Sequence, residues 1–376
     1  MNGTPRNTSN RIFGLDVLRA GSIMMVLFSH SSVIYPESHG VLSKLKDLSG
    51  FFGIELFFGL SGFLIGSSMF KLFVYGEYRF RDVKDFLLRR LFRILPSYYL
   101  VLLINLGIFL WFSFSIDEIW KYFLLLQNIN RPIPAFFPES WSLPVKEIGY
   151  VIALALLLLV LLIFSRLSRK KLFFIVIAFL ISISFLAKIY YHFNSDNLSL
   201  AVWSQSVRSV VLYRLDSVLF GVLFGCFYLE FPAFFKNHRL LFVVLGFLFF
   251  VLFILGLAYF GLRLENAAWF WNVFVLPFAS LIVLLFFPML LHWEKGSIVL
   301  EKPVKFFCDI SYSVYLIHYS IVLFLLMQIF DLKSFSSLEL NLFTFGYLAL
   351  TIGLSYLFYR YFEKPINSYR LSTYKL

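Results

Sequence analysis

Long apolar segments alternate with short polar ones along the whole chain of 376 residues. An α-helix rises ~1.5 Å per residue, so about 20 apolar residues cross the ~30 Å hydrocarbon core of a bilayer. Ten segments come close to that length, at 13–35, 51–73, 94–114, 147–164, 171–190, 208–230, 239–262, 269–291, 307–330 and 341–362. The pattern therefore predicts an all-α integral membrane protein with about ten transmembrane helices.

Basic residues are distributed unevenly between the polar segments. With the N-terminus in the cytoplasm, the cytoplasmic segments hold 22 Lys and Arg residues and the outer segments hold 9. Loops of membrane proteins that stay in the cytoplasm carry such an excess. We therefore expect both termini to be cytoplasmic. We also expect one membrane domain over residues 1–376, with short cytoplasmic tails at 1–12 and 363–376.

Composition narrows the class of protein further. Hydrophobic residues make up 60% of the chain and charged residues only 14%, which excludes a soluble globular domain. The net charge of +12 is then best explained by contact with anionic lipid headgroups. We therefore expect membrane lipids as partners and no nucleic acid.

The first apolar helix contains the ionisable residues Asp16, Arg19 and His30. Such residues are costly inside a membrane and often functional. Arg19 and His30 are eleven positions apart, so they share one helix face at a separation of about 16 Å. Each residue also has a structural explanation that remains open. Arg19 could only anchor the helix end through an ion pair with Asp16, and His30 could only be a hydrogen-bonded packing residue.

Two further groups lie near this helix in the predicted topology. Glu55 falls in the outer half of the second span, at about the depth of His30, where a carboxylate can orient an imidazole base. The alternative is a glutamate in water at the membrane interface. A basic run with Arg89, Arg90 and Arg93 precedes the third span. It is typical either of a phosphate site or of a lipid-headgroup anchor.

Other polar residues recur inside or beside the later spans. Arg214 and Asp216 lie in the outer half of span six, where an Arg–Asp pair has a structural or a functional role. In span nine, Tyr315 and His318 share a face, as either an interhelical hydrogen-bond cluster or a catalytic pair. The longest outer loop, 115–139, contains a segment at 116–130 that favours an interfacial helix.

Seven motifs in order along the chain resemble the acyltransferase-3 family of bacterial membrane O-acyltransferases, which acylate sugars and other cell-surface polymers. The motifs are Leu15-Asp-x-Leu-Arg19 with His30, Phe57-Phe-x-Leu-Ser-Gly-Phe63, Arg89-Arg-x-x-Arg93-Ile-x-Pro96, Trp141-Ser-Leu, Arg214-Leu-Asp216, Ser311-Tyr-x-x-Tyr-Leu-x-His318 and Glu363-Lys-Pro365. Each motif is weak alone, and their order gives the resemblance its strength.

The resemblance implies a ten-helix core in a bacterial inner (cytoplasmic) membrane. Such a core takes an acyl group, usually acetyl, from cytoplasmic acyl-CoA. It transfers the group to a hydroxyl of a cell-surface glycan or lipid-linked glycan, such as a lipopolysaccharide precursor, at the outer side. The family's functional arginine and histidine correspond to Arg19 and His30. Acetyl-CoA is the expected donor, and the sequence contains no metal-ligand cluster or G-x-S-x-G motif.

These considerations assign provisional roles. His30 is the expected general base, Glu55 its orienter and Arg19 the cation on the donor side. Arg19, Arg89, Arg90 and Arg93 are expected to hold the phosphates of the donor. The candidates for contacts with substrate or with the oxyanion are Trp141, Arg214, Asp216, Tyr312, Tyr315 and His318.

One position departs from the family pattern. Lys146 stands where the family commonly has a glutamate, and Glu147 follows it on a different helix face. Three explanations remain open: a natural variant, a site at which Glu147 compensates, or an engineered loss-of-function form. Our hypothesis from the sequence is that Lys146 weakens acceptor binding or activity, so that Lys146→Glu raises turnover.

A polytopic transporter or flippase for a polysaccharide or its acyl donor is the alternative function. Polar residues within spans also line permeation paths. Inverted repeats would favour a transporter, and we find none in the sequence.

Overall fold

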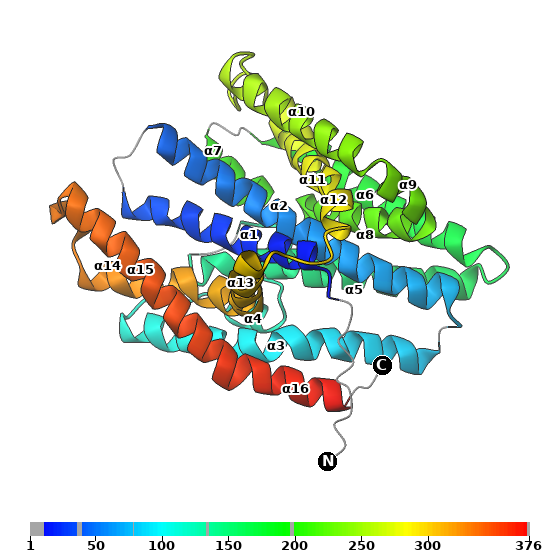
Figure 1. Ribbon diagram of the computed structural model, residues 1–376, viewed down its shortest axis with the longest axis horizontal. Coiled ribbons are helices and arrows are strands. Elements are labelled where there is room, and N and C mark those ends of the chain that lie inside the picture. Colours follow the sequence, from blue (N-terminus) through cyan, green and yellow to red (C-terminus); the bar gives the residue numbers. More distant parts are fainter. Residues whose placement is uncertain (1–10, 36–39, 78, 133–134, 196–198, 374–376) are drawn as a thin grey trace.

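Helices account for all the regular secondary structure in the described part of the chain (Figure 1). The computed structural model describes residues 11–35, 40–77, 79–132, 135–195 and 199–373. The α-helices are α1 (Phe13–His30), α2 (Val41–Phe70), α3 (Phe80–Trp111), α4 (Trp120–Phe123), α5 (Ser142–Ile163), α6 (Arg169–Asn194), α7 (Leu200–Trp203), α8 (Leu215–Glu230), α9 (Pro232–Asn237), α10 (Arg239–Ala258), α11 (Val275–Leu285), α12 (Phe287–Leu291), α13 (Ile298–Ile317), α14 (Phe324–Ile329), α15 (Ser337–Phe358) and α16 (Lys364–Thr373). This confirms the all-α class.

Nine helical stretches within the described residues are long and apolar enough to cross a membrane. They are Phe13–Ile34, Val41–Tyr75, Phe80–Trp111, Pro138–Ile163, Arg169–Asn194, Arg239–Ala258, Phe270–Leu291, Ile298–Ile329 and Ser337–Tyr369. The protein is therefore a multi-pass membrane protein. Several stretches include short π-helical turns, among them η2 (Lys71–Tyr75) and η7 (His318–Leu323).

The expected span at 208–230 differs from the others. Only its second part is a regular helix, α8, which has 16 residues. It follows the short turns η4 (Ser204–Arg208) and η5 (Val211–Tyr213). Four residues in and between these turns are buried, namely Val207, Ser209, Val210 and Val211, so this part of the irregular backbone is shielded by protein, as a membrane interior requires.

Helix α8 packs along α2, and the two helices form the centre of the molecule. Glycines permit this contact. A Cβ atom on Gly62 of α2 would lie 2.1 Å from the carbonyl oxygen of Val218, and one on Gly221 of α8 would lie 2.5 Å from that of Gly59. Small residues let helix backbones approach closely in membrane proteins. Gly62 is thus explained by packing, whereas Ser61 beside it lines the cavity at the basic end of the molecule.

The loop before α5 is folded against the bundle. Its expected helix at 116–130 is reduced to α4, which has four residues. The hydroxyl of Tyr122 donates to the carbonyl oxygen of Phe136 at 2.6 Å, and both side chains are buried beside α3. Span four then begins at Pro138 with the short turn η3 (Pro138–Trp141), earlier than the expected residue 147.

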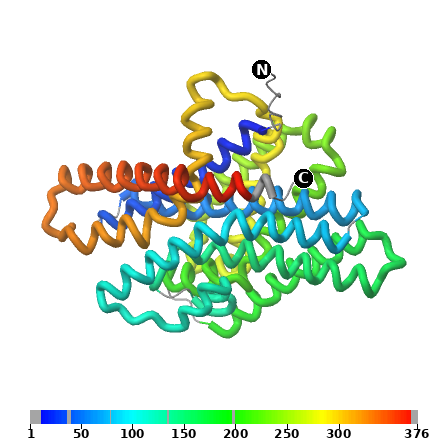
Figure 2. The backbone as a smooth tube through the Cα atoms, turned by 90° about the horizontal axis from the view of Figure 1, so that it is seen from below, coloured from blue at the N-terminus to red at the C-terminus, as the bar shows by residue number. Residues whose placement is uncertain are grey.

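The two ends of the bundle differ in charge. Its basic end carries Arg11, Lys71 and the run that includes Arg89, and its far end carries the starts of α2 and α15. In Figures 1 and 2 helix α15 runs from the far end toward the basic end and packs against α13, and α16 follows it and packs against α3. Helix α1 starts at the basic end and reaches His30 at its last residue.

Candidate active site

A cavity of 1020 Å³ lies at the basic end, between α1, α2, α3, α5, α13 and the turn before α16. Seven cationic side chains and three carboxylates line it, so its walls carry a net positive charge. The cations are Arg11, Arg19, Lys71, Arg89, Arg90, Arg93 and Lys146, and the carboxylates are Glu147, Asp309 and Glu363. The structure therefore brings together all four arginines expected at a phosphate site, Arg19, Arg89, Arg90 and Arg93.

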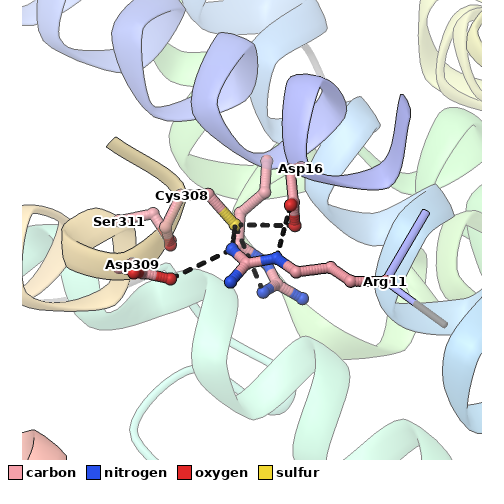
Figure 3. A network of polar contacts seen from close by, with 6 residues as sticks. Arg11, Asp16, Cys308, Asp309 and Ser311 are labelled. Carbon is pink, nitrogen blue, oxygen red and sulfur yellow. Dashed lines mark hydrogen bonds and ion pairs between the residues drawn. The ribbon is translucent and has the colours of Figure 1, made fainter. Parts of the chain in front are cut away.

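Arg11 holds the start of α1 against α13 in this cavity wall (Figure 3). It forms ion pairs with Asp16 and, at 3.0 Å, with Asp309. Burial lowers the pKa of Arg11, but the hydrogen bonds to the two carboxylates more than offset this, so its pKa lies above the usual value. Arg19 instead points its Nη1 atom toward the Cys308 thiol, at 3.7 Å. The alternative Asp16–Arg19 ion pair is therefore not the arrangement observed.

The cavity ends at hydroxyl groups from α5 and α13. Ser142 donates to the hydroxyl oxygen of Tyr315 at 3.0 Å, and the Tyr315 hydroxyl donates to the carbonyl oxygen of Glu139. The Tyr312 hydroxyl donates to the carbonyl oxygen of Ile94 at 2.9 Å. Both tyrosines line the cavity, but their hydroxyl protons are already used within the protein.

Two histidines lie beyond this end of the cavity. The ring of His318 is 6.5 Å from that of Tyr315, measured between centroids, and His318 is fully buried. Its Nε2 atom lies 2.6 Å from Nδ1 of half-buried His30. The ring of Tyr319 packs on His30 at 4.9 Å. The partner of His30 is thus another imidazole.

Glu55 lies elsewhere. One carboxylate oxygen accepts from Arg214 at 2.5 Å, and the other accepts from the Ser280 hydroxyl at 2.8 Å. Both Glu55 and Arg214 are fully buried, and the contacts that the structure describes do not join Glu55 to His30. The expectation that Glu55 orients His30 therefore has no support in the geometry.

The expected Arg214–Asp216 pair is also rearranged. Asp216 forms a fully buried ion pair with Lys188 of α6, while Arg214 bonds to Glu55 of α2. Charges at this depth remain ionised only when they are paired. These four residues hold α8 to its neighbours, which makes a structural role the better explanation for Arg214 and Asp216.

Sequence reasoning missed Arg208 as a neighbour of His30. Its guanidinium donates to the carbonyl oxygen of Gly50 at 3.1 Å, and a Cβ atom on Gly50 would touch Ser29, the residue before His30. Arg208 also lies over the ring of Trp141 at 5.8 Å, and its charge acts on the His30 imidazole. Among the described residues its buried Nε atom has no hydrogen-bond partner.

Glu139 is a second residue that sequence reasoning missed. It is buried, and one of its carboxylate oxygens accepts from the backbone NH and the hydroxyl of Ser320, at 2.9 and 2.6 Å. This contact attaches η3 to the turn that carries His318. A buried carboxylate in a loop of three prolines leaves no periodic pattern from which it could have been identified.

Lys146 lies in the wall of the cavity, inside the helical stretch Pro138–Ile163 and not before the start of a span as expected. The charges that act on it are those of Glu147, Arg93 and Arg19. It therefore belongs to the basic end of the site. The hypothesis from the sequence had linked Lys146 to weaker acceptor binding or activity.

The chain shows similarity to one family and to a curated relative. Residues 12–360 match the acyltransferase-3 family, described as "Acyltransferase domain". A protein of Bacillus subtilis (strain 168) named "Putative peptidoglycan O-acetyltransferase YrhL" is 25% identical over 229 residues. That alignment covers 57% of this chain and 32% of the relative, so it spans about a third of the relative's length. No solved structure gives a significant match.

The family match and the fold agree with each other. The match extends from the start of α1 to the end of α15, and so includes both histidines and all the cavity-lining residues except Arg11, Glu363 and Asn367. In the described residues, no three His, Cys, Asp or Glu side chains are grouped as a metal site would require. The chain is a multi-pass membrane protein that belongs to the acyltransferase-3 family.

Proposed function

We propose that the protein is a membrane O-acyltransferase of a bacterial inner membrane. It transfers an acyl group, acetyl in the simplest case, from cytoplasmic acyl-CoA to a hydroxyl of a glycan or lipid-linked glycan at the outer face. The whole chain acts as one membrane domain. The name of the Bacillus subtilis relative makes peptidoglycan fragments one acceptor class to test, beside lipopolysaccharide precursors.

The observation that carries this proposal is the alignment of the cavity with the histidine pair. The cavity has a net positive lining at the basic end and ends at Ser142 and Tyr315. Beyond Tyr315, the ring of His318 lies 6.5 Å from the Tyr315 ring, and the ring of His30 lies 4.8 Å from that of His318, both measured between centroids. Acyl-CoA has the matching shape, with phosphates at one end and a thioester at the end of a long arm. Guanidinium groups suit such phosphates.

His30 then serves as the general base. Its imidazole takes the proton from the acceptor hydroxyl while the hydroxyl oxygen attacks the thioester carbon. The tetrahedral intermediate collapses with cleavage of the carbon–sulfur bond, and the imidazolium returns its proton to the departing CoA thiolate. The products are an ester on the acceptor and free CoA, and the base is regenerated.

Arg208 is the proposed donor to the oxyanion of that intermediate. Tyr312, Tyr315 and Arg214 were expected in this role, but the two tyrosine hydroxyls are directed to Ile94 and Glu139. Arg214 has no described partner at Nε and Nη1, but its Nη2 atom is bound to Glu55, which has no described contact with His30. Arg208 lies beside His30 and retains a donor at Nε that no described residue engages. Donors already in place where negative charge develops lower the barrier of acyl transfer.

The test uses purified protein in nanodiscs with radiolabelled acetyl-CoA and either lipid-linked glycans or peptidoglycan fragments. We expect loss of thioester and label on one acceptor. His30→Ala should lower turnover by at least about 100-fold, the usual minimum for removing a general base. His192→Ala is the matched control, because His192 lies at the end of α6 and bonds to Asn272 at 3.2 Å.

Two results would overturn the proposal. One is a wild-type protein that neither binds nor consumes acetyl-CoA with any of these acceptors, which would favour the transporter. The other is a His30→Ala variant that turns over as fast as His192→Ala.

A further inference from the structure

His318 opens a π-helical turn directly opposite the end of α1. The turn η7 (His318–Leu323) continues α13, and its first residue points into the protein, fully buried. Single π-helical turns within longer helices often occur at functional sites. His318 contacts His30, which is 288 positions away in sequence.

The hydrogen bonds of His318 determine which of its nitrogens carries the proton. Its Nδ1 atom lies 3.0 Å from the carbonyl oxygens of Val314 and of Tyr315. Carbonyl oxygens only accept, so Nδ1 must be the donor. In a neutral ring the other nitrogen, Nε2, then holds a lone pair.

The same reasoning extends to His30. Because Nε2 of His318 accepts, the proton in the 2.6 Å contact comes from Nδ1 of His30. In the neutral ring of His30 the lone pair is therefore on Nε2, the nitrogen that faces away from His318. The chain of hydrogen bonds runs from His30 through His318 to backbone carbonyl groups.

We propose that His318 is a positioning residue that holds His30 in the tautomer with its basic nitrogen at Nε2. The inference rests on the proposed role of His30 as the general base. A free imidazole exchanges its proton between both nitrogens and rotates, which leaves the basic nitrogen misdirected part of the time. The hydrogen bond made by one ring nitrogen sets the state of the other.

Glu139 fixes the position of His318 in turn. Its carboxylate accepts from the backbone NH of Ser320, in the same turn, and its own carbonyl oxygen accepts from Tyr315, one turn earlier. These two contacts bracket His318 on both sides and attach it to η3. The loop before α5 thereby helps to position His30, although Glu139 and His30 are far apart in the sequence.

The kinetic test compares His318→Leu with His318→Gln. Leucine fills the space without an acceptor, whereas the amide oxygen of glutamine can accept from His30 near the position of Nε2. We expect His318→Leu to lower kcat about 100-fold without changing KM for acetyl-CoA, and His318→Gln to recover at least tenfold of that loss. His192→Leu serves as the control for loss of a histidine remote from the site.

A spectroscopic test does not depend on turnover. In protein labelled with 15N-histidine, nitrogen shifts distinguish a protonated Nδ1 from a protonated Nε2, and His30→Gln identifies the His30 signals by their loss. We expect Nδ1–H for His30 in the wild type and in His318→Gln. In His318→Leu we expect a shift toward the Nε2–H tautomer.

The inference is overturned if wild-type His30 carries its proton on Nε2. It is also overturned if a folded His318→Gln is as inactive as His318→Leu, or if His318→Leu keeps full kcat. If His318→Leu keeps full kcat while His30→Ala has no activity, the role of His318 is disproved but the proposed function is still supported. A wild-type protein without turnover would instead remove the proposed function, whatever the spectra show.

Discussion

At the scale of single residues, the expected role of Lys146 depends on where its side chain lies in the fold. The preceding turn starts α5 at a point that places Lys146 in the cavity wall with Arg19 and Arg93. A lysine there adds to the positive lining. A glutamate, the residue common at this position in the family, would reduce it by two charges. The side chain is therefore expected to act on the binding of the anionic donor.

We predict that Lys146→Glu raises KM for acetyl-CoA about tenfold and leaves kcat within about twofold. Near a protein surface two unit charges at 4 Å interact by about 4 kcal/mol, and solvent and salt reduce this strongly. Initial rates at varied acetyl-CoA concentration measure the change, which should shrink at high salt. Lys84→Glu is the control, because Lys84 is exposed at the start of α3 and does not line the cavity.

A lower KM, or a higher kcat in Lys146→Glu, would contradict this prediction. Higher turnover would return support to the hypothesis drawn from sequence, in which Lys146 hinders the acceptor. Lys146→Gln, which only removes the charge, should fall between the wild type and Lys146→Glu.

At the scale of helices, the contact of α2 with α8 depends on the absence of side chains. Gly62 faces the backbone of α8 so closely that a methyl group would overlap Val218, whose carbonyl oxygen is part of a helix and cannot move alone. Glu55 of α2 and Arg214, the residue directly before α8, also form a fully buried ion pair between these two segments. Close backbone packing and a buried ion pair thus both join α2 to the segment that contains α8.

We predict that Gly62→Ala destabilises the protein by about 1–3 kcal/mol, the usual cost of overpacking. The measurement is thermal unfolding in detergent, together with size-exclusion chromatography. Gly107→Ala in α3 is the matched control, because a Cβ atom there meets no described atom within 4 Å. That variant should be neutral or slightly more stable, since alanine favours helix more than glycine does. Equal unfolding temperatures for the two variants would contradict the proposed role of Gly62.

At the scale of the whole molecule, charge predicts orientation. Two basic residues assigned to outer segments from the sequence, Lys46 and Lys188, are buried within the bundle, and a third, Lys146, is half-buried in the cavity wall. The true outer surface is therefore poorer in cations than the sequence count implies. This strengthens the prediction that the basic end and both termini face the cytoplasm.

Cysteine accessibility in cells tests this orientation. In a Cys226→Ala/Cys308→Ala background, we introduce Glu77→Cys beside the basic end or Arg263→Cys between α10 and α11; both positions are exposed. We expect an impermeant thiol reagent to label Arg263→Cys in spheroplasts, and to label Glu77→Cys only after the membrane is permeabilised. The reverse pattern would mean that the topology is inverted and that the cavity opens to the outside.

The order of apolar and polar residues determined the class of fold and much of the basic lining of the cavity. Helix length follows from local composition, so most spans were predicted, although α8 was expected to be longer. Arg19 and His30 were placed on one face because helical periodicity is local. Arg89, Arg90 and Arg93 were grouped because they are adjacent in sequence.

The partners across helices were decided only by the tertiary structure. His30 meets His318, and Glu55 meets Arg214, where the sequence had suggested a Glu55–His30 contact. Depth in the membrane can be read from a span, but the rotation of each helix about its axis cannot. That rotation depends on packing such as the Gly62–Val218 contact between distant segments. It alone determines which side chains at equal depth face each other.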